Sequence, residues 1–97
     1  MELKIEGTIG EERGEKVAVV RVKNPSEALA FFIRLALIKG KDGLEVAPSY
    51  WNENCFSLLP GEEKIVRVRF SEKDLEGKAP FIRTCGWNII EKEYQLY

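Results

Sequence analysis

The chain has 97 residues, of which 44% are hydrophobic and 32% charged, and its 15 basic and 16 acidic side chains give a net charge of −1. This is the composition of one globular domain spanning residues 1–97, and the near-neutral charge argues against a nucleic-acid partner. The absence of histidine excludes histidine-dependent catalytic triads, and no apolar run reaches the ~18 residues of a membrane span.

Short β-branched and aromatic runs between turn residues predict strands along the first part of the chain. A first strand is expected at Leu3–Glu6 and ends at Gly7. A second is expected at Lys16–Lys23, and its alternation places three residues on one face: Ala18, Val20 and Val22. This strand ends before Pro25, because proline has no N–H to donate to a neighbouring strand.

The longest alternating apolar stripe predicts the central core strand. It consists of Leu29, Phe31, Ile33, Leu35 and Leu37. Phe32 and Arg34 fall on the opposite face. Helix propensity would also allow a helix here, but the period of two favours a strand. With Phe31 buried, its replacement by alanine should cost about 3–5 kcal/mol.

The middle of the chain predicts two turns. Lys39–Gly43 indicates a hairpin connection to a strand from Leu44 to about Tyr50. Leu59–Glu62 contains Pro-Gly at its centre, which is typical of a type II turn.

The last third predicts two more strands. Ile65–Phe70 should bury Val66, Val68 and Phe70 and direct Arg67 and Arg69 to solvent. Ser71–Asp74 has capping-box spacing for one helical turn before Gly77. A final strand is expected at Phe81–Ile90, followed by a frayed tail at residues 91–97. About seven strands in fewer than 100 residues predict an all-β, immunoglobulin-like antiparallel β-sandwich.

The two cysteines predict neither a metal site nor a cofactor. Cys55 and Cys85 lie 30 residues apart, whereas a zinc site needs four ligands in local pairs. We expect two free, mostly buried thiols, in preference to a disulfide.

No catalytic residues are predicted. The adjacent acids Glu11-Glu12 and Glu62-Glu63 lie in turns, and Glu91 and Glu93 lie in the tail, where carboxylates are usually solvated. No nucleophile-elbow or phosphate-loop motif occurs.

The candidate binding residues are aromatic and polar side chains at a break in the strand pattern: Tyr50, Trp51, Asn52, Glu53 and Asn54. The Trp51 ring could stack on a sugar, contact another protein, or cover one end of the core. We expect it to be partly exposed at one end of the sandwich, so that Trp51→Ala changes stability by less than about 1 kcal/mol. Trp87 is a second candidate, for which packing inside the domain is the favoured interpretation.

Five stretches in order resemble a known family: Asn24-Pro25-Ser26, Ala30–Leu35, Tyr50–Asn54, Phe56–Glu63 and Gly86-Trp87-Asn88. Together they resemble the C-terminal immunoglobulin-like domain of β-mannosidase-type glycoside hydrolases of family two, including the exo-β-glucosaminidase and endo-β-mannosidase branches. The resemblance covers roughly residues 16–88. One departure is that relatives usually have Ser-Asp-Asn where this chain has Asn52-Glu53-Asn54.

The resemblance implies a non-catalytic accessory domain. The catalytic glutamates of such enzymes belong to a (β/α)₈ barrel, which takes about 250 residues that this chain lacks. The expected partners are the other domains of a parent glycosidase, with the Tyr50–Asn54 segment facing the barrel or substrate channel. Two alternatives are an independent carbohydrate-binding module that uses Trp51 as its platform and a free-standing adhesion or assembly sandwich. No signal peptide is expected, because Glu2, Lys4 and Glu6 lie where its apolar segment would have to be. No membrane partner is expected either, because no apolar run is long enough to span a bilayer.

Overall fold

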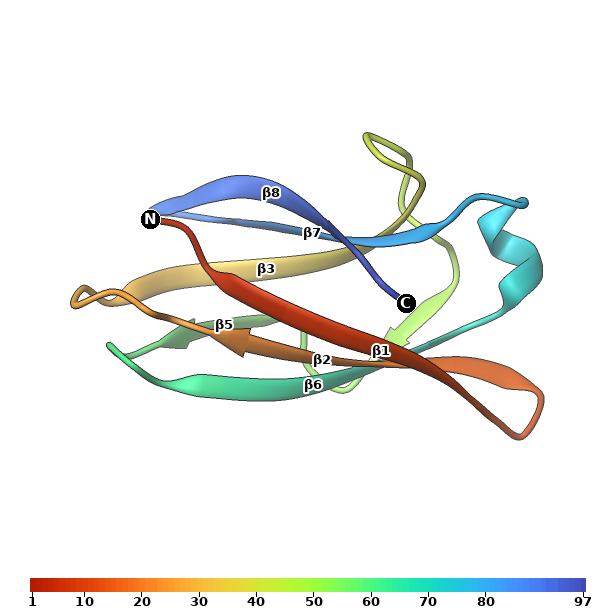
Figure 1. Cartoon of the computed structure of the whole chain (residues 1–97), viewed down its shortest axis with the longest axis horizontal. Helices are drawn as coiled ribbons and strands as arrows, with labels where there is room; N and C mark the ends of the chain where they lie inside the picture. Colours follow the sequence, from red (N-terminus) through yellow and green to blue (C-terminus); the bar gives the residue numbers. More distant parts are fainter.

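The computed structural model describes all residues 1–97 and consists of two four-stranded antiparallel sheets packed face to face (Figure 1). The first sheet has the order β1 (Lys4–Glu12), β2 (Glu15–Lys23), β6 (Glu63–Phe70) and β4 (Ser49–Trp51). The second has the order β5 (Cys55–Leu58), β3 (Ala30–Lys39), β7 (Pro80–Gly86) and β8 (Ile89–Gln95). A 3₁₀ turn, η1 (Glu72–Leu75), connects β6 with β7. The predicted antiparallel β-sandwich is confirmed.

One core of 17 buried residues fills the space between the sheets. As predicted, β2 contributes Ala18, Val20 and Val22, and β6 contributes Val66, Val68 and Phe70. Arg67 and Arg69 alternate with the β6 residues and point to solvent. The central strands β2 and β6 thus each have one buried face, and the outer face of β6 alternates with it and is exposed, the usual pattern of an antiparallel sheet with one solvated side.

The start of β3 differs from the prediction because the strand contains a bulge between Ala30 and Ile33. The extra residue turns both phenylalanines outward, so that Phe31 is 42% and Phe32 63% exposed. Phe31 was predicted as a core residue, and that prediction is wrong. Leu29, the first residue of the predicted stripe, precedes β3 and is only partly buried. The rest of the stripe, beginning at Ile33, is buried as expected.

The expected hairpin after β3 is present, since Glu45 forms an antiparallel bridge with Ile38 and the Val46 N–H donates to the Leu37 carbonyl (2.8 Å). The strand predicted from Leu44 to Tyr50 is nevertheless not continuous, because the chain changes sheets here. After β3, residues 40–46 form a loop that reaches β7 and β8: the Arg83 guanidinium donates to the Gly43 carbonyl (2.8 Å), and the Asp42 N–H donates to Glu93 (2.7 Å). The chain then crosses to the first sheet, where β4 pairs with β6. Only Ser49–Trp51 form a strand.

The C-terminal part forms two strands where one was predicted. The chain turns at Trp87-Asn88, and β8 pairs with β7 from Ile89 to Gln95. Glu91–Gln95 therefore belong to a sheet rather than to a frayed tail, and Leu96 is buried. Gly7 leaves room for the Leu96 side chain, and β1 continues through this glycine to Glu12 rather than ending there.

Both predicted turns of the later chain are present. The Glu62 N–H donates to the Leu59 carbonyl (3.0 Å), and Gly61 has a φ of +76°, as a type II turn requires. The short helical turn after Ser71 is η1, which buries Leu75 against the core.

Tyr94 gives the fold a pH dependence at alkaline pH. Its hydroxyl donates to the Leu3 carbonyl (2.8 Å), and partial burial raises the pKa of Tyr94 above its ordinary value of 10.0. The unfolded chain therefore ionises at this residue first, and stability falls as pH rises above about 10. We expect Tyr94→Phe to lose less stability than wild type between about pH 9 and 11 in urea unfolding. Equal losses would contradict this assignment.

Candidate functional site

The Tyr50–Asn54 segment crosses from the first sheet to the second, between β4 and β5. In the β4–β6 pair, Tyr50 lies opposite Arg69 and Trp51 opposite Val68. Because successive strand residues point to opposite faces, Tyr50 points outward and Trp51 inward. Tyr50 is 54% exposed, and the Arg69 guanidinium lies 5.6 Å from its ring centroid. Trp51 is half-buried and packs against the core, so its predicted partial exposure is confirmed.

The three remaining residues of the segment stabilise the crossover. Asn52 continues the β4–β6 ladder: its N–H donates to the Arg67 carbonyl (3.1 Å), and its Oδ1 accepts the Arg67 N–H (2.7 Å). Glu53 forms an ion pair with Lys64 (2.6 Å). The Asn54 carbonyl accepts the Leu35 N–H (2.9 Å), which connects the segment to β3. These polar groups are thus largely used within the domain.

Two arginines that sequence reasoning assigned only to solvent complete the surroundings of this segment. Arg67 and Arg69 line a shallow hollow of about 250 Å³ together with Tyr50, Trp51 and Asn52. Arg67 pairs with Glu12 (2.8 Å) and Arg69 with Glu15 (3.6 Å). The alternation of β6 could have placed these arginines on one face, but only the β4–β6 register shows that they lie beside Tyr50.

Trp87 lies away from this segment. It belongs to the β7–β8 turn at the end of the sandwich where β3 begins, on the left of Figure 1, whereas β4 pairs with the far end of β6. Its side chain is 82% exposed, so the packing interpretation of Trp87 is wrong. The predicted candidate residues therefore do not form one site.

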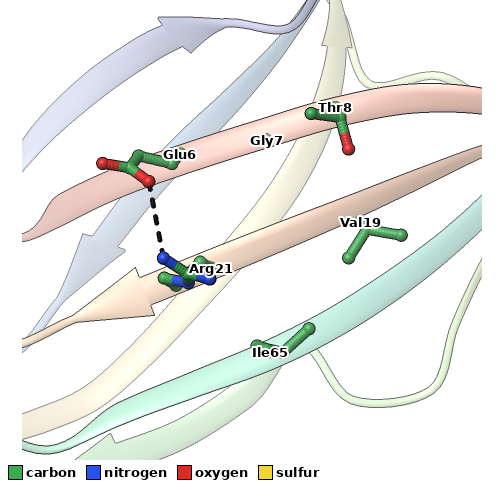
Figure 2. A pocket seen from close by; sticks show the side chains of 6 residues that line it. All are labelled: Glu6, Gly7, Thr8, Val19, Arg21 and Ile65. Carbon is green, nitrogen blue, oxygen red and sulfur yellow. Dashed lines mark ion pairs between the residues drawn. The ribbon is translucent and has the colours of Figure 1, made fainter.

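The outer face of the first sheet carries another shallow hollow, shown in Figure 2. It has a volume of about 160 Å³ and lies over β1, β2 and β6, with Arg21 paired to Glu6 (3.7 Å) along one side. Both hollows are smaller than the ~300–1,000 Å³ typical of small-molecule sites.

Several of the acidic residues considered for hydrolysis are engaged in local contacts. Most of them lie on strands rather than in the predicted turns and tail: Glu11 and Glu12 end β1, Glu63 begins β6, and Glu91 and Glu93 lie on β8. Glu11 pairs with Lys16 (3.1 Å), and this hydrogen bond raises the pKa of Lys16 above its ordinary value. Glu12 pairs with Arg67, and a Glu62 oxygen accepts the Leu59 N–H (3.1 Å).

Both cysteines are free, as predicted. They flank Arg34 in the sheet, Cys55 on β5 and Cys85 on β7. Two strand spacings separate their Cα atoms by roughly 10 Å, which is too far for a disulfide. The expectation that both are mostly buried is wrong for Cys55, which is exposed because it alternates with the core-facing Phe56 and Leu58 and therefore points to the outer face of the sheet.

Cys55 should accordingly react with a thiol reagent before Cys85. We expect about a tenfold difference in labelling rate in the folded protein, set by access to the thiol. Cys55→Ser should remove the fast phase, and Cys85→Ser, the matched control, should retain it. Two thiols that react only on unfolding would contradict this prediction.

The two packed antiparallel sheets define an immunoglobulin-like β-sandwich. A family model described as the exo-β-D-glucosaminidase Ig-fold domain matches residues 1–89, and the chain belongs to this family. The crystal structure of the exo-chitosanase CsxA of Amycolatopsis orientalis superposes with a TM-score of 0.83 and 27% identity, covering 97% of this chain and 12% of CsxA. The predicted immunoglobulin-like fold and the predicted family resemblance are both confirmed.

Similar proteins are much longer glycoside hydrolases. The exo-β-D-glucosaminidase of Streptomyces avermitilis is 35% identical over 81 residues, which cover 81% of this chain and 9% of that enzyme. The mannosylglycoprotein endo-β-mannosidase of Lilium longiflorum is 27% identical over 88 residues, which cover 84% of this chain and 9% of that enzyme. The chain thus spans less than a tenth of the length of these relatives. No helix in the structure is long and apolar enough to cross a membrane.

Proposed function

We propose that residues 1–97 are one non-catalytic accessory domain of a larger glycoside hydrolase of family two, and that it packs against the other domains of that enzyme. The observation that carries this proposal is the match to a domain family over residues 1–89, in relatives of which the domain is about 9%. The shallow hollows and the paired carboxylates of the chain are consistent with a domain that contributes surface rather than chemistry.

In this proposal the parent enzyme cleaves β-glucosaminides or β-mannosides, the substrate classes that the names of the relatives imply. The outward ring of Tyr50, beside Arg69, is the part of the Tyr50–Asn54 segment most available to a neighbouring barrel or substrate channel. Asn52, Glu53 and Asn54 position this part by fixing the crossover between the sheets.

The carbohydrate-module alternative receives less support. A stacking platform requires an exposed ring face, whereas Trp51 points inward against the core. Titration of the isolated chain with chitosan oligosaccharides, followed by tryptophan fluorescence, tests this alternative. Saturable binding that Trp51→Ala abolishes would favour it.

The isolated chain should not hydrolyse aryl β-glucosaminides or β-mannosides. The reason is that glycoside hydrolysis needs two carboxyls held about 5–10 Å apart across a cleft. The candidate acids lie instead on strands and in one turn, and several of them are held in ion pairs or hydrogen bonds. Turnover by highly purified protein is compared with a mock preparation. Activity that exceeds the mock and survives repeated purification would contradict the proposal.

A further inference from the structure

An exposed aromatic cluster, Phe31, Phe32 and Trp87, lies at the end of the second sheet where β3 begins. Their side chains are 42%, 63% and 82% exposed, respectively. The ring centroids of the two phenylalanines lie 5.6 Å apart. The backbone N–H of Trp87 donates to the backbone carbonyl of Phe31 (3.1 Å), so the three residues are neighbours. Three exposed aromatic side chains at one place are unusual in a domain that is complete by itself.

The backbone under the cluster is held by specific contacts. The Asn88 Oδ1 accepts the Phe31 N–H (2.9 Å), and its Nδ2 donates to the Leu29 carbonyl (2.7 Å). Phe32 has a φ of +48°, an unfavourable conformation for a bulky residue. Gly86 is needed opposite, because a Cβ there would lie 2.9 Å from the Phe32 carbonyl oxygen. A strained bulge maintained in this way presents both rings outward.

The loop of residues 40–46 already covers the other end of the same sheet face. Ala36 and Ile38 are buried without belonging to the core between the sheets. Two hydrogen bonds hold the loop over this region: Arg83 of β7 donates to the Gly43 carbonyl, and the Asp42 N–H donates to Glu93 of β8. The domain thus supplies its own cover for one half of the face and leaves the aromatic cluster uncovered.

We infer that the aromatic cluster is the docking surface through which this domain packs against the domain that precedes it in a parent glycosidase chain. The inference rests on the proposed function and adds a second contact surface to the Tyr50 and Arg69 face proposed above for the barrel or substrate channel. The amino group of Met1 donates to the Asn88 carbonyl (2.5 Å), and the Met1 carbonyl accepts the Ile90 N–H (2.7 Å). Figure 1 shows the N-terminus beside the turn between β7 and β8, to which Trp87 belongs. Chain on the N-terminal side of the domain would therefore join it beside the cluster.

The area of the cluster favours a tethered partner. With 150–250 Å² for a complete aromatic side chain, the exposed parts amount to roughly 400 Å². A stable complex between separate proteins buries about 800 Å² on each partner, about twice as much. A domain of the same chain needs less contact area, because the tether keeps it at an effective concentration of about millimolar. A second copy of the domain is therefore a less favoured partner for the cluster than a domain of the same chain.

A glycan is disfavoured for a different reason. Sugar recognition needs polar side chains beside the stacking ring to bind hydroxyls. The nearest ones are engaged in the bulge: Asn88 as above, and Ser57, whose Oγ accepts the Phe32 N–H (3.0 Å). The two phenylalanine rings are also tilted by 35° and do not form one flat platform.

The test uses the Streptomyces avermitilis enzyme with its matching segment replaced by residues 1–97, studied by calorimetry. We expect the domain to unfold roughly 10 °C higher in this chimera than alone, because docking stabilises it. The double variant Phe32→Ser/Trp87→Ser should remove that increment. Leu44→Ser, an equally apolar and exposed position on the 40–46 loop, is the matched control and should retain it. The isolated double variant should melt within about 2 °C of wild type, which establishes that it folds.

The other possible results contradict either this inference alone or both the inference and the proposed function. An increment that survives the double substitution would show docking through another face and overturn this inference, while the accessory function stands. A chimera in which the wild-type domain melts as it does alone would overturn both. Dimerisation of the isolated chain that the double substitution abolishes would assign the cluster to a second copy. Quenching of Trp87 fluorescence by chitosan oligosaccharides would assign it to a glycan.

Discussion

Phe70→Ala should lower the free energy of unfolding of this chain by about 3–5 kcal/mol. Phe70 is the largest of the fully buried side chains and is 1% exposed. It lies on β6 between Lys16 of β2 and Ser49 of β4, so its ring contributes to the core near the end of the first sheet. Truncation leaves a cavity that the surrounding strands can only partly fill, because their backbones are fixed by the ladder. Urea unfolding measures the loss, which is a large part of the ~5–15 kcal/mol typical of a domain.

Phe31→Ala is the matched control, since it removes the same ring from the bulge. Phe31 is 42% exposed and lies outside the core cluster, so we expect a loss of less than about 1 kcal/mol. Equal losses for the two substitutions would show that the bulge does not turn Phe31 outward. A loss below about 1 kcal/mol for Phe70→Ala would contradict its place in the core.

The sequence predicted the parts of the fold in which local pattern and tertiary environment agree. On β2 and β6 the alternation is uninterrupted, so counting by two identifies Val20 and Val68 as core residues. The turn at Leu59–Glu62 was predictable because Gly61 must adopt a positive φ and proline precedes it. In both cases a single local rule determines the structure.

The missed features depend on contacts between distant residues. The β3 bulge is stabilised by Asn88 and Ser57, which lie 57 and 25 residues further along the chain from their partners. An apolar stripe at Leu29–Leu37 contains no local signal of an inserted residue, so it predicts Phe31 inside. The change of sheet after β3 likewise depends on bonds from the 40–46 loop to Arg83 and Glu93. The polar tail is a strand because β7 pairs with it, not because of its composition.

The candidate surfaces were predicted only in part, because they too depend on contacts between distant residues. The break in alternation at Tyr50–Asn54 correctly indicated a segment between strands, yet its partner Arg69 is identified only by the β4–β6 register. Trp87 was recognised as notable but assigned to packing, because a continuous last strand would have buried it. Its exposure follows from the turn at Trp87-Asn88. Composition therefore located aromatic residues, whereas topology determined which of them are available to a partner.

Asn24 is fully buried and connects the ends of four segments by hydrogen bonds. Its Nδ2 donates to the carbonyls of Ala28 (2.7 Å), Leu58 (3.2 Å) and Leu59 (3.3 Å). Its Oδ1 accepts from the N–H (3.0 Å) and hydroxyl (2.8 Å) of Ser26. The end of β2, the start of β3, the end of β5 and the following turn are thus joined by one amide. A buried polar group of this kind stabilises only while its partners are satisfied.

Asn24→Leu should therefore destabilise the domain by about 2–4 kcal/mol, although leucine has a similar volume, because it leaves buried carbonyl groups without a donor. Ser26→Ala, which removes one partly exposed hydroxyl, should cost only about 1 kcal/mol.

Asn24→Asp keeps the size and shape of the side chain but changes its hydrogen bonding. At neutral pH its carboxylate would face three carbonyl oxygens, and desolvation and repulsion would raise its pKa above the ~3.9 of the unfolded chain. The deficit relative to wild type should thus be largest above that folded pKa and shrink as pH falls through it towards 3.9, where the folded aspartic acid is protonated and can again donate one bond. Urea unfolding at neutral and acidic pH measures this difference, and an Asn24→Asp deficit that is independent of pH would show that the carbonyl oxygens do not surround this side chain.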